Sequence, residues 1–235
     1  PENQGFLGIG PSGNLSRGIP NPNVWSFTED KKTGLMFIGT DVSVTRFNRR
    51  TGYFEQFYRN QHVQAETEAA ETAVLSVHAI DANQLLVGCV DGLFELNITS
   101  SKSYSFKRIP FFEQPENLKH ARIYSIKPFD QTRYLIGTKA GLLIYDIKTK
   151  VIRVFEHDPK NPKTSITAGV CRYIYKNKAG QFMLATSTGE LNILTEQNGT
   201  IQIRPYAFNA MLLKQSKDYI TSICQVGTHT YWLGT

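Results

Sequence analysis

The sequence predicts an all-β protein built as a β-propeller, a ring of four-stranded antiparallel sheets called blades. Three observations predict this fold: a repeat with a period of about 49 residues, strand-like runs at matching places in each period, and polar or glycine-containing turns between the runs. A propeller blade has four short strands in about this length. A β-sandwich would not need so strict a period, so the propeller is the better interpretation.

The most regular part of each repeat is a short apolar run that ends in a small residue, in most copies followed by Thr. The small residues are Gly39, Gly88, Gly137, Ala185 and Gly234, at intervals of 49, 49, 48 and 49 residues. Each run is predicted to be the second strand of a blade.

The other strands are placed relative to these runs. Predicted first strands start near residues 24, 74, 123, 171 and 220. Four of the five first strands carry Ser in their third position, which suits a crowded place near the propeller axis, where a small side chain lets neighbouring blades converge. Third strands are predicted at 44–47, 93–96, 142–145 and 191–194, and fourth strands at 53–58, 151–155 and 201–204. Asn198-Gly199 is a signal for a two-residue hairpin.

The domain organisation follows from the repeat. Residues 1–235 are expected to form a single propeller region with a partial blade at 1–23 and an incomplete last blade. Only 61–73 favours a helix, and we interpret it as an insertion between two repeats. Because both ends of the chain supply a second strand, they cannot complete one blade together. The chain is therefore expected to be part of a larger propeller of about seven blades.

Composition excludes several classes of protein. With 40% hydrophobic and 20% charged residues the chain is not a disordered one, and its formal charge of +6 is spread along the sequence rather than gathered into a nucleic-acid-binding stripe. No apolar window is long enough to span a membrane, and the chain is expected to carry no targeting signal of its own. Cys89, Cys171 and Cys224 each lie in an apolar run and are expected to be buried thiols without a disulfide.

Motifs for cofactors and catalysis are weak. Residues 8–13 match the Gly-x-Gly-x-x-Gly dinucleotide pattern, but Pro20 and Pro22 follow, where a helix would be needed to hold the pyrophosphate. No histidines have metal-ligand spacing, and there is no nucleophile elbow. Asp30 with Gly34 resembles the Asp-box turn of sialidase-like propellers, which is structural. We expect no cofactor, no metal site and no catalytic residues.

A resemblance to a known family rests on two segments. The connector at 155–166, with its aromatic residue followed by a His/Asp/Pro/Asn/Pro string and Ser-Ile, resembles the inter-blade connection of the two-component regulator propeller repeats. His157 is expected to make a turn-stabilising hydrogen bond there. Residues 24–40, with Glu29-Asp30, Gly34 and Gly39-Thr40, resemble the body of the same repeat. The tryptophan usual in the family's second strand is present only as Trp232.

The resemblance implies a periplasmic sensor domain of a Bacteroidetes hybrid two-component system, a sensor histidine kinase joined to a response regulator. Such a protein has two propellers and a small β-sandwich outside the inner membrane, and its kinase lies inside. This region would be non-catalytic, would bind an oligosaccharide derived from a glycan, and would contact the second propeller and the β-sandwich of the same polypeptide. The full-length form is expected to be a homodimer, attached to the membrane only through that full-length protein, with no nucleic-acid partner.

Candidate ligand-binding residues come from the segments that lead into the first strands, from those strands, and from the loops joining second to third strands. They are Asn23, Trp25, Asp41, Asp91, Arg122, Tyr124, Lys139, Arg172 and Tyr173. Aromatic faces stack on sugar rings, and Arg, Asn, Asp and Lys side chains hydrogen-bond hydroxyls or carboxylates. Two alternatives stay open at this stage. A carbohydrate-active enzyme, a glycoside hydrolase or lyase, would need a cluster of carboxylates or an Arg/Tyr/Glu set on one face, and a protein-interaction scaffold would bind no small molecule.

Overall fold

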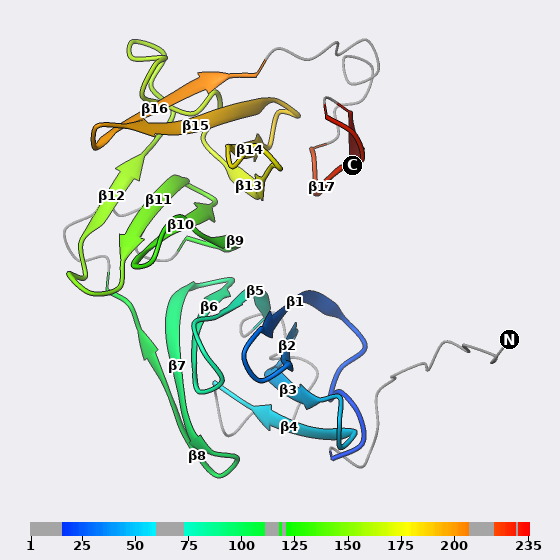
Figure 1. Ribbon diagram of the computed structural model, residues 1–235. Helices are drawn as coiled ribbons and strands as arrows, with labels where there is room; N and C mark the ends of the chain where they lie inside the picture. The colour runs from blue at the N-terminus through cyan, green and yellow to red at the C-terminus, as the bar shows by residue number, and fades with distance from the viewer. Residues whose placement is uncertain (1–15, 60–72, 111–117, 119–120, 207–218, 229) are drawn as a thin grey trace, which may run out of the picture. The chain divides into compact units, whose positions relative to one another are not determined.

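The computed structural model describes residues 16–59, 73–110, 118, 121–206, 219–228 and 230–235. All the elements assigned within these ranges are strands (Figure 1). The chain divides into two compact units, which comprise residues 1–109 and 110–235 and are here called unit 1 and unit 2. Each unit is described by itself.

Unit 1 contains two four-stranded antiparallel sheets, each with its strands in sequence order. The first is formed by β1 (Val24–Asp30), β2 (Leu35–Thr40), β3 (Val44–Asn48) and β4 (Tyr53–Phe57). The second is formed by β5 (Val74–Ala79), β6 (Gln84–Cys89), β7 (Gly92–Ser100) and β8 (Ser103–Arg108). β8 supplies the fourth strand of the second repeat, which the sequence pattern does not locate.

Unit 2 contains two further sheets of the same kind and a two-stranded one. The four-stranded sheets are β9 (Ile123–Pro128), β10 (Arg133–Thr138), β11 (Gly141–Asp146) and β12 (Ile152–Phe155), then β13 (Cys171–Lys176), β14 (Phe182–Thr186), β15 (Leu191–Gln197) and β16 (Thr200–Pro205). The last sheet pairs β17 (Ser222–Gln225) with β18 (Tyr231–Gly234). The predicted all-β fold of four-stranded antiparallel blades is confirmed, whereas the single propeller region over 1–235 stays a prediction.

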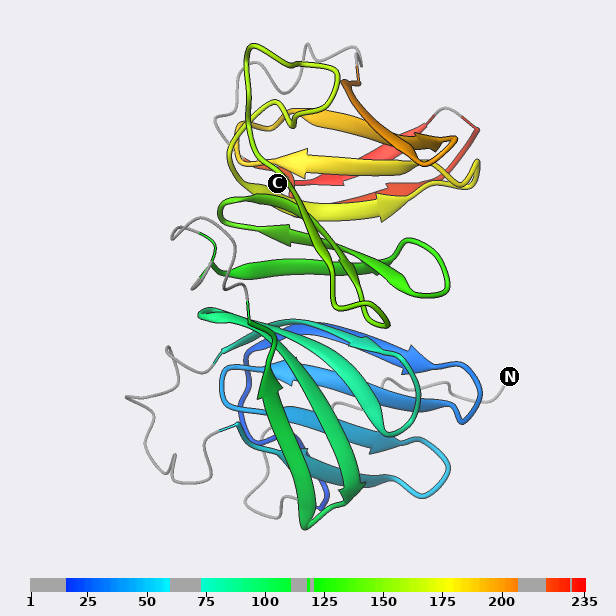
Figure 2. The same ribbon diagram turned by 90° about the vertical axis from the view of Figure 1, so that its left-hand side faces the viewer.

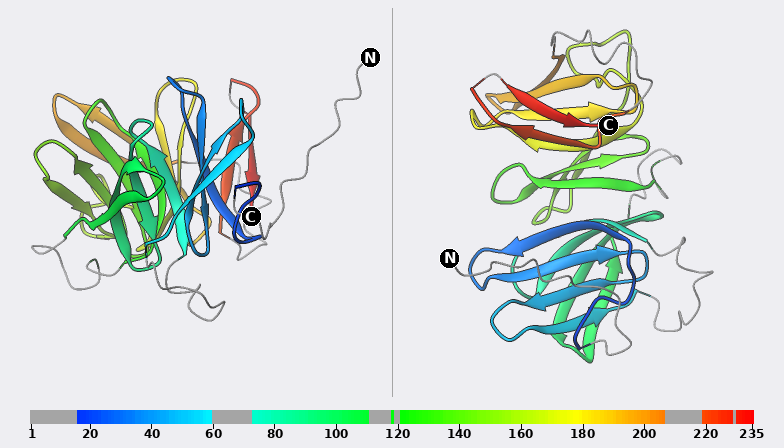
Figure 3. Two further views of the ribbon diagram at one scale, coloured as in Figure 1. Left: turned by 90° about the horizontal axis from the view of Figure 1, so that it is seen from below. Right: turned by 90° about the vertical axis from the view of Figure 1, so that its right-hand side faces the viewer.

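Within each unit the blades pack face to face through apolar side chains. Figure 2 shows the two sheets of unit 1 stacked, and Phe37 and Phe57 of the first blade share a buried cluster with Leu85 of the second. In unit 2, Leu135 lies in a cluster that contains Phe182 of the next blade. A third cluster joins β13–β16 to β17–β18, which Figure 3 shows in yellow to orange and in red. Inter-blade burial therefore explains why the strands are apolar on both sides.

The small residue of the second strand lies where adjacent blades come closest in the first and third blades. A Cβ atom added to Gly39 would lie 2.9 Å from the backbone oxygen of Val74, and one added to Gly137 would lie 2.8 Å from that of Cys171. The repeated serine lies at the same junction, since Ser125 Oγ accepts a hydrogen bond of 3.3 Å from the Ile174 amide of the next blade. The repeat period of about 49 residues therefore reflects a contact between neighbouring blades. The serine pattern predicts this close approach.

The Thr that follows the small residue closes the turn between the second and third strands. Thr138 Oγ1 donates a hydrogen bond of 2.9 Å to the Gly141 carbonyl and accepts one of 3.0 Å from the Ala140 amide. Thr186 Oγ1 donates in the same way to the Glu190 carbonyl at 3.2 Å. A hydroxyl at this place satisfies backbone groups that the sheet ladder leaves unpaired.

Aspartates close the turns between the first and second strands. Asp30 accepts hydrogen bonds from the Lys32 and Thr33 amides, and Gly34 has a φ of +72° there. Asp130 accepts the corresponding amide hydrogen bonds from Thr132 and Arg133. The expectation that the turn of Asp30 and Gly34 is structural is therefore confirmed.

These turns make a prediction for pH dependence. The Thr33 hydroxyl lowers the pKa of Asp30, and in the turn between the third and fourth strands of the third blade the Thr149 amide lowers the pKa of Asp146, both from an ordinary value of 3.8. A carboxylate whose pKa is lower in the folded state stabilises the fold above its unfolded value, and that stability is lost as the pH falls through the folded value. The urea concentration at which half of the protein is unfolded should therefore decrease as the pH is lowered below 3.8.

An Asp146→Asn variant provides the matched test of this pH dependence. Asn48 occupies the corresponding turn of the first blade, where its Oδ1 accepts hydrogen bonds from the Arg50 and Thr51 amides. An asparagine should therefore keep the turn without titrating. Urea unfolding at pH 6 and pH 3 should show a smaller loss of stability in the variant than in the unchanged chain. An equal loss in both proteins would contradict the assignment.

The connector between the last two four-stranded blades has its own hydrogen bonds. His157 Nδ1 lies 2.9 Å from the Ile166 carbonyl oxygen, which confirms the turn-stabilising role predicted for this histidine. Asp158 accepts a hydrogen bond from the Lys160 amide, and Ser165 Oγ donates one of 2.9 Å to the Asp158 carbonyl. The Asn198-Gly199 hairpin is confirmed as well, with φ values of 49° and 75°.

One expectation about the cysteines is wrong. Cys89 and Cys171 are buried, and burial raises the pKa of each thiol to about 12, but Cys224 is exposed. Cys224 pairs with Trp232 across the two-stranded sheet, and Trp232 is itself 70% exposed, so this face of the sheet is uncovered among the described residues. An apolar run alone could not show which face is covered.

Some expectations lie outside the described residues. They are most of the partial blade at 1–23, the dinucleotide-like pattern at 8–13, and the predicted helix at 61–73 up to residue 72. In the part of the chain that is described, no helix has the length and apolar character needed to cross a membrane.

Candidate functional site

A β-bulge recurs at the start of the first strand in all four of the four-stranded blades. The register between the first and second strands slips by one residue at each of these places, so that one residue of the first strand has no partner. The extra residues are Trp25, Leu75, Tyr124 and Arg172. A bulge bends the strand and redirects a side chain, and such bulges are frequent beside functional sites. Three of the four bulge residues are candidates predicted from the sequence.

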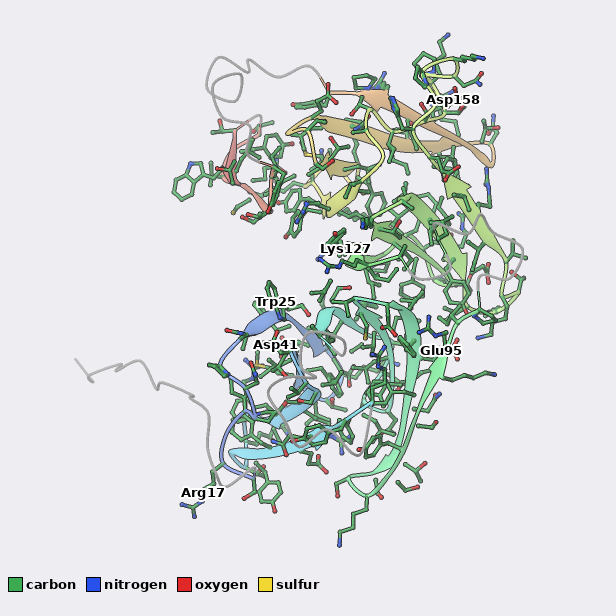
Figure 4. The ribbon with its side chains drawn as sticks, turned by 180° about the vertical axis from the view of Figure 1, so that it is seen from behind. Arg17, Trp25, Asp41, Glu95, Lys127 and Asp158 are labelled. Atoms are coloured by element: carbon green, nitrogen blue, oxygen red, sulfur yellow. The ribbon has the colours of Figure 1, made fainter. Side chains whose placement is uncertain are left out.

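In unit 1 the bulge residue Trp25 belongs to a hydrogen-bonded cluster. Asp41 accepts a hydrogen bond of 2.6 Å from Trp25 Nε1 and another of 2.6 Å from Asn23 Nδ2. Trp25 is 56% exposed, and Figure 4 shows it beside Asp41 at the end of the blade. The carboxylate thus fixes the edge of an indole ring whose face is open to solvent. Such a ring offers a stacking surface that is already oriented.

Asp91 has a different environment from the one that the sequence suggests. Arg59 pairs with one of its carboxylate oxygens and Arg108 with the other, the latter at 2.7 Å. Both guanidinium groups also lie over the Phe94 ring, at 4.6 and 4.9 Å from its centroid. Asp91 is therefore held in an ion-pair network, and this place presents arginine N–H groups. The sequence does not identify Arg59 or Arg108, because neither lies in the loops where candidates were sought.

In unit 2 the bulge residue Arg172 lies between two aromatic rings. Its guanidinium carbon is 4.9 Å from the centroid of the Tyr124 ring and 3.7 Å from that of the Tyr219 ring. The Arg172 Nε atom is buried and has no hydrogen-bond partner among the described residues. Two predicted candidates, Tyr124 and Arg172, are therefore in contact. Tyr219 was missed, since it precedes a predicted first strand that offered no polar motif.

Arg122 and Lys139 are joined through their backbones at the same end of the third blade. The Lys139 amide donates a hydrogen bond of 3.0 Å to the Arg122 carbonyl, and the Val90 amide makes the corresponding bond to Ala73 in the second blade. The segment that leads into a first strand therefore lies beside the loop that follows the second strand. Candidate residues come from these two places because both are expected to lie at the same end of a blade. Both cationic side chains are exposed.

Tyr173 is placed apart from the bulge residues. It packs against the apolar cluster between β13–β16 and β17–β18, and burial raises the pKa of its phenol. A search of the described residues finds no group of three or more side chains that could hold a metal ion. The arrangement can bind by stacking and hydrogen bonding, through Asn23, Trp25 and Asp41 in unit 1 and through Tyr124, Arg172 and Tyr219 in unit 2. For all nine candidates, a role in ligand binding stays a prediction.

No protein-family model matches the chain, and no curated protein matches it. Among solved structures, the extracellular domain of BT3049 from B. thetaiotaomicron, assigned as a hybrid two-component system, matches with a TM-score of 0.70 and 18% identity over all of this chain and 28% of that one. The extracellular domain of BT4673 from the same organism, also assigned as a hybrid two-component system, matches with a TM-score of 0.56 and 18% identity over 93% of this chain and 27% of that one.

A third similar structure comes from a different organism. The β-propeller domain of Cps50 (Swd1) from Myceliophteria thermophila has a TM-score of 0.57 and 14% identity over 78% of this chain and 58% of that one. The chain spans less than a third of the length of the two bacterial domains. At these identities the comparisons show the fold. The chain therefore has propeller blades, and its structural neighbours include extracellular domains of hybrid two-component systems, the kind of protein that its repeat resembles.

Proposed function

We propose that the chain is a non-catalytic extracytoplasmic sensor domain that binds an oligosaccharide and signals to a histidine kinase of a hybrid two-component system. The observation that carries this proposal is the bulge repeated in the blades, which presents Trp25, Tyr124 and Arg172 at the ends of the first strands. Because the main chain repeats while these side chains differ, the blades offer different ligand contacts, each at the end of its own sheet.

The chemistry of these side chains suits a sugar. A pyranose ring has an apolar face that stacks on an aromatic ring, and its hydroxyls need donors and acceptors at the ring edge. Trp25 supplies the face, while Asn23 and Asp41 supply polar atoms beside it. Two of the similar solved structures are extracellular domains of hybrid two-component systems, which supports a sensory role outside the cytoplasm.

The remaining parts of the proposal concern the whole protein. The domain lies in the periplasm as part of an inner-membrane protein, and it contacts a second propeller and a β-sandwich of the same polypeptide. The full-length protein is a homodimer, and the ligand shifts the arrangement of its subunits. A ligand can shift that equilibrium only by its difference in affinity for the two arrangements.

A thermal-shift screen of the chain against neutral and acidic oligosaccharides tests the proposal, followed by chromatography of the best ligand after long incubation. A ligand that binds the native state should raise the melting temperature and be recovered intact. Trp25→Ala or Tyr124→Ala should reduce the shift. Tyr53→Ala is the matched control, because Tyr53 is 58% exposed at the start of β4 and is not a bulge residue.

Two outcomes would contradict the proposal. Cleavage of the oligosaccharide would indicate a carbohydrate-active enzyme, and the absence of a shift with every glycan would favour a protein-interaction scaffold. An equal loss of shift in Tyr53→Ala and Trp25→Ala would show that the bulge does not mark the site.

A further inference from the structure

The described neighbours of Arg172 supply no hydrogen-bond acceptor for its guanidinium group. Its guanidinium group lies over the Tyr124 and Tyr219 rings, but no described residue accepts a hydrogen bond from it, and its Nε atom is buried. Arginine remains charged at all ordinary pH values and carries five N–H donors in one plane. A buried donor without an acceptor costs about 1–3 kcal/mol, and more when the group is charged. The site therefore lacks an acceptor in the guanidinium plane.

Other arginines in the chain have such an acceptor. Arg133 donates to both oxygens of Glu196 at 2.7 Å, and Arg46 donates from Nε to Glu55 at 2.8 Å. Arg172 differs from them because the residues that it contacts are two tyrosine rings, which hold the plane of the guanidinium but offer it no carboxylate. Stacking and cation–π contacts leave the edge of the plane available for a bidentate partner.

The described charges at this end of unit 2 favour an anion. Arg122 and Lys139 lie there with exposed side chains, and Glu190 follows the loop after β14. The Glu190 carboxylate accepts a hydrogen bond of 3.0 Å from Thr188 in its own loop. Glu156, which follows β12 beside Gly141, is a second carboxylate at this end. The cations Arg122, Lys139 and Arg172 therefore outnumber these two carboxylates and favour a negatively charged ligand.

We propose that Arg172 binds the carboxylate or sulfate group of an acidic oligosaccharide, with the sugar ring placed beside Tyr124. This inference rests on the proposed function and adds the chemical class of the ligand. Both groups present paired oxygens that match the guanidinium fork. Tyr219 is 40% exposed, so its side chain has room to rotate toward solvent. That rotation would give the ligand access to the Arg172 Nε atom.

Calorimetric titration of the chain with two pairs of probes tests this proposal. One pair is a galacturonate tetrasaccharide and its methyl ester, and the other is a κ-carrageenan tetrasaccharide and its desulfated form. Within each pair the sugar is the same and only the charged group is changed. At least one acidic probe should bind about tenfold or more tightly than its neutral partner, as expected for hydrogen bonds to a charged group. The pair that shows the difference identifies the group as carboxylate or sulfate.

Variants of Arg172 assign the effect to this residue. Arg172→Met keeps an unbranched stem between the tyrosine rings and should remove the preference for the acidic probe, whereas Arg172→Lys should retain part of it. Arg153→Met is the matched control, because Arg153 also lies over an aromatic ring, that of Phe155, but on the fourth strand of its blade. The melting temperature of each variant shows whether it has folded.

The outcomes separate this inference from the proposed function. If neutral oligosaccharides bind and neither acidic probe binds more tightly, the sensor function stands and the acidic ligand is wrong. If Arg172→Met keeps the preference, Arg172 is not the binding group. If no oligosaccharide of any kind binds, both proposals fail.

Discussion

Replacing Leu135 with Ala should lower the free energy of unfolding by about 2–5 kcal/mol, the usual cost of a leucine-to-alanine cavity in a closed core. Leu135 is completely buried on β10 and belongs to the cluster that contains Phe182 and Leu184 of the next blade. The cavity would therefore open between two blades. Removing the leucine should loosen the face-to-face contact that holds the two four-stranded sheets of unit 2 together.

Urea unfolding followed by circular dichroism measures this effect, with Val151→Ala as the control. Val151 is 56% exposed, so its truncation should change the free energy of unfolding by no more than about 0.5 kcal/mol. If Leu135→Ala is no more destabilising than Val151→Ala, the inter-blade cluster does not contribute to stability as described.

Adding one methyl group at the blade junction should also destabilise the chain, in Gly137→Ala by about 1–3 kcal/mol. The new Cβ would lie 2.8 Å from the Cys171 carbonyl oxygen, which belongs to the backbone of the next blade and cannot move without moving that strand. Gly39→Ala should have a similar effect in unit 1, where the nearest backbone atom is the Val74 oxygen.

Gly169→Ala is the matched control for these glycines. Nothing lies within 4 Å of a Cβ atom at Gly169, so this variant should unfold at the same urea concentration as the unchanged chain or slightly higher. The fourth blade carries Ala185 at the junction, which indicates that its contact with the following strand is less tight. Equal stability of Gly137→Ala and Gly169→Ala would contradict the account of the junction.

Much of the fold could be predicted because the same kind of contact recurs in different repeats. Gly39 and Gly137 come close to the next blade, and Thr138 closes the following turn, so each blade needs the same residue types at the same spacing. The first-strand serine follows the same rule through Ser125. Such repeated constraints make a period visible in a single sequence.

The candidate site could be predicted only in part. The sequence places Trp25, Tyr124 and Arg172 at corresponding positions, but the register slip that redirects them depends on strand pairing, which an apolar pattern does not encode. Tyr219 and the two arginines on Asp91 come from other segments and are brought in only by folding. Burial follows from the neighbouring sheet, so neither the exposure of Cys224 nor the packing of Tyr173 against an apolar cluster could be inferred from the sequence around it.

The central claim is that the bulge residues of the first strands contact a sugar ligand. The most direct test is a crystal structure of the chain with the oligosaccharide that gives the largest thermal shift. We predict an intact sugar whose ring lies either on Trp25 of unit 1 or beside Tyr124 of unit 2, and in the second case any acidic group is paired to Arg172. An oligosaccharide bound away from all three bulge residues, or found cleaved, would contradict the account.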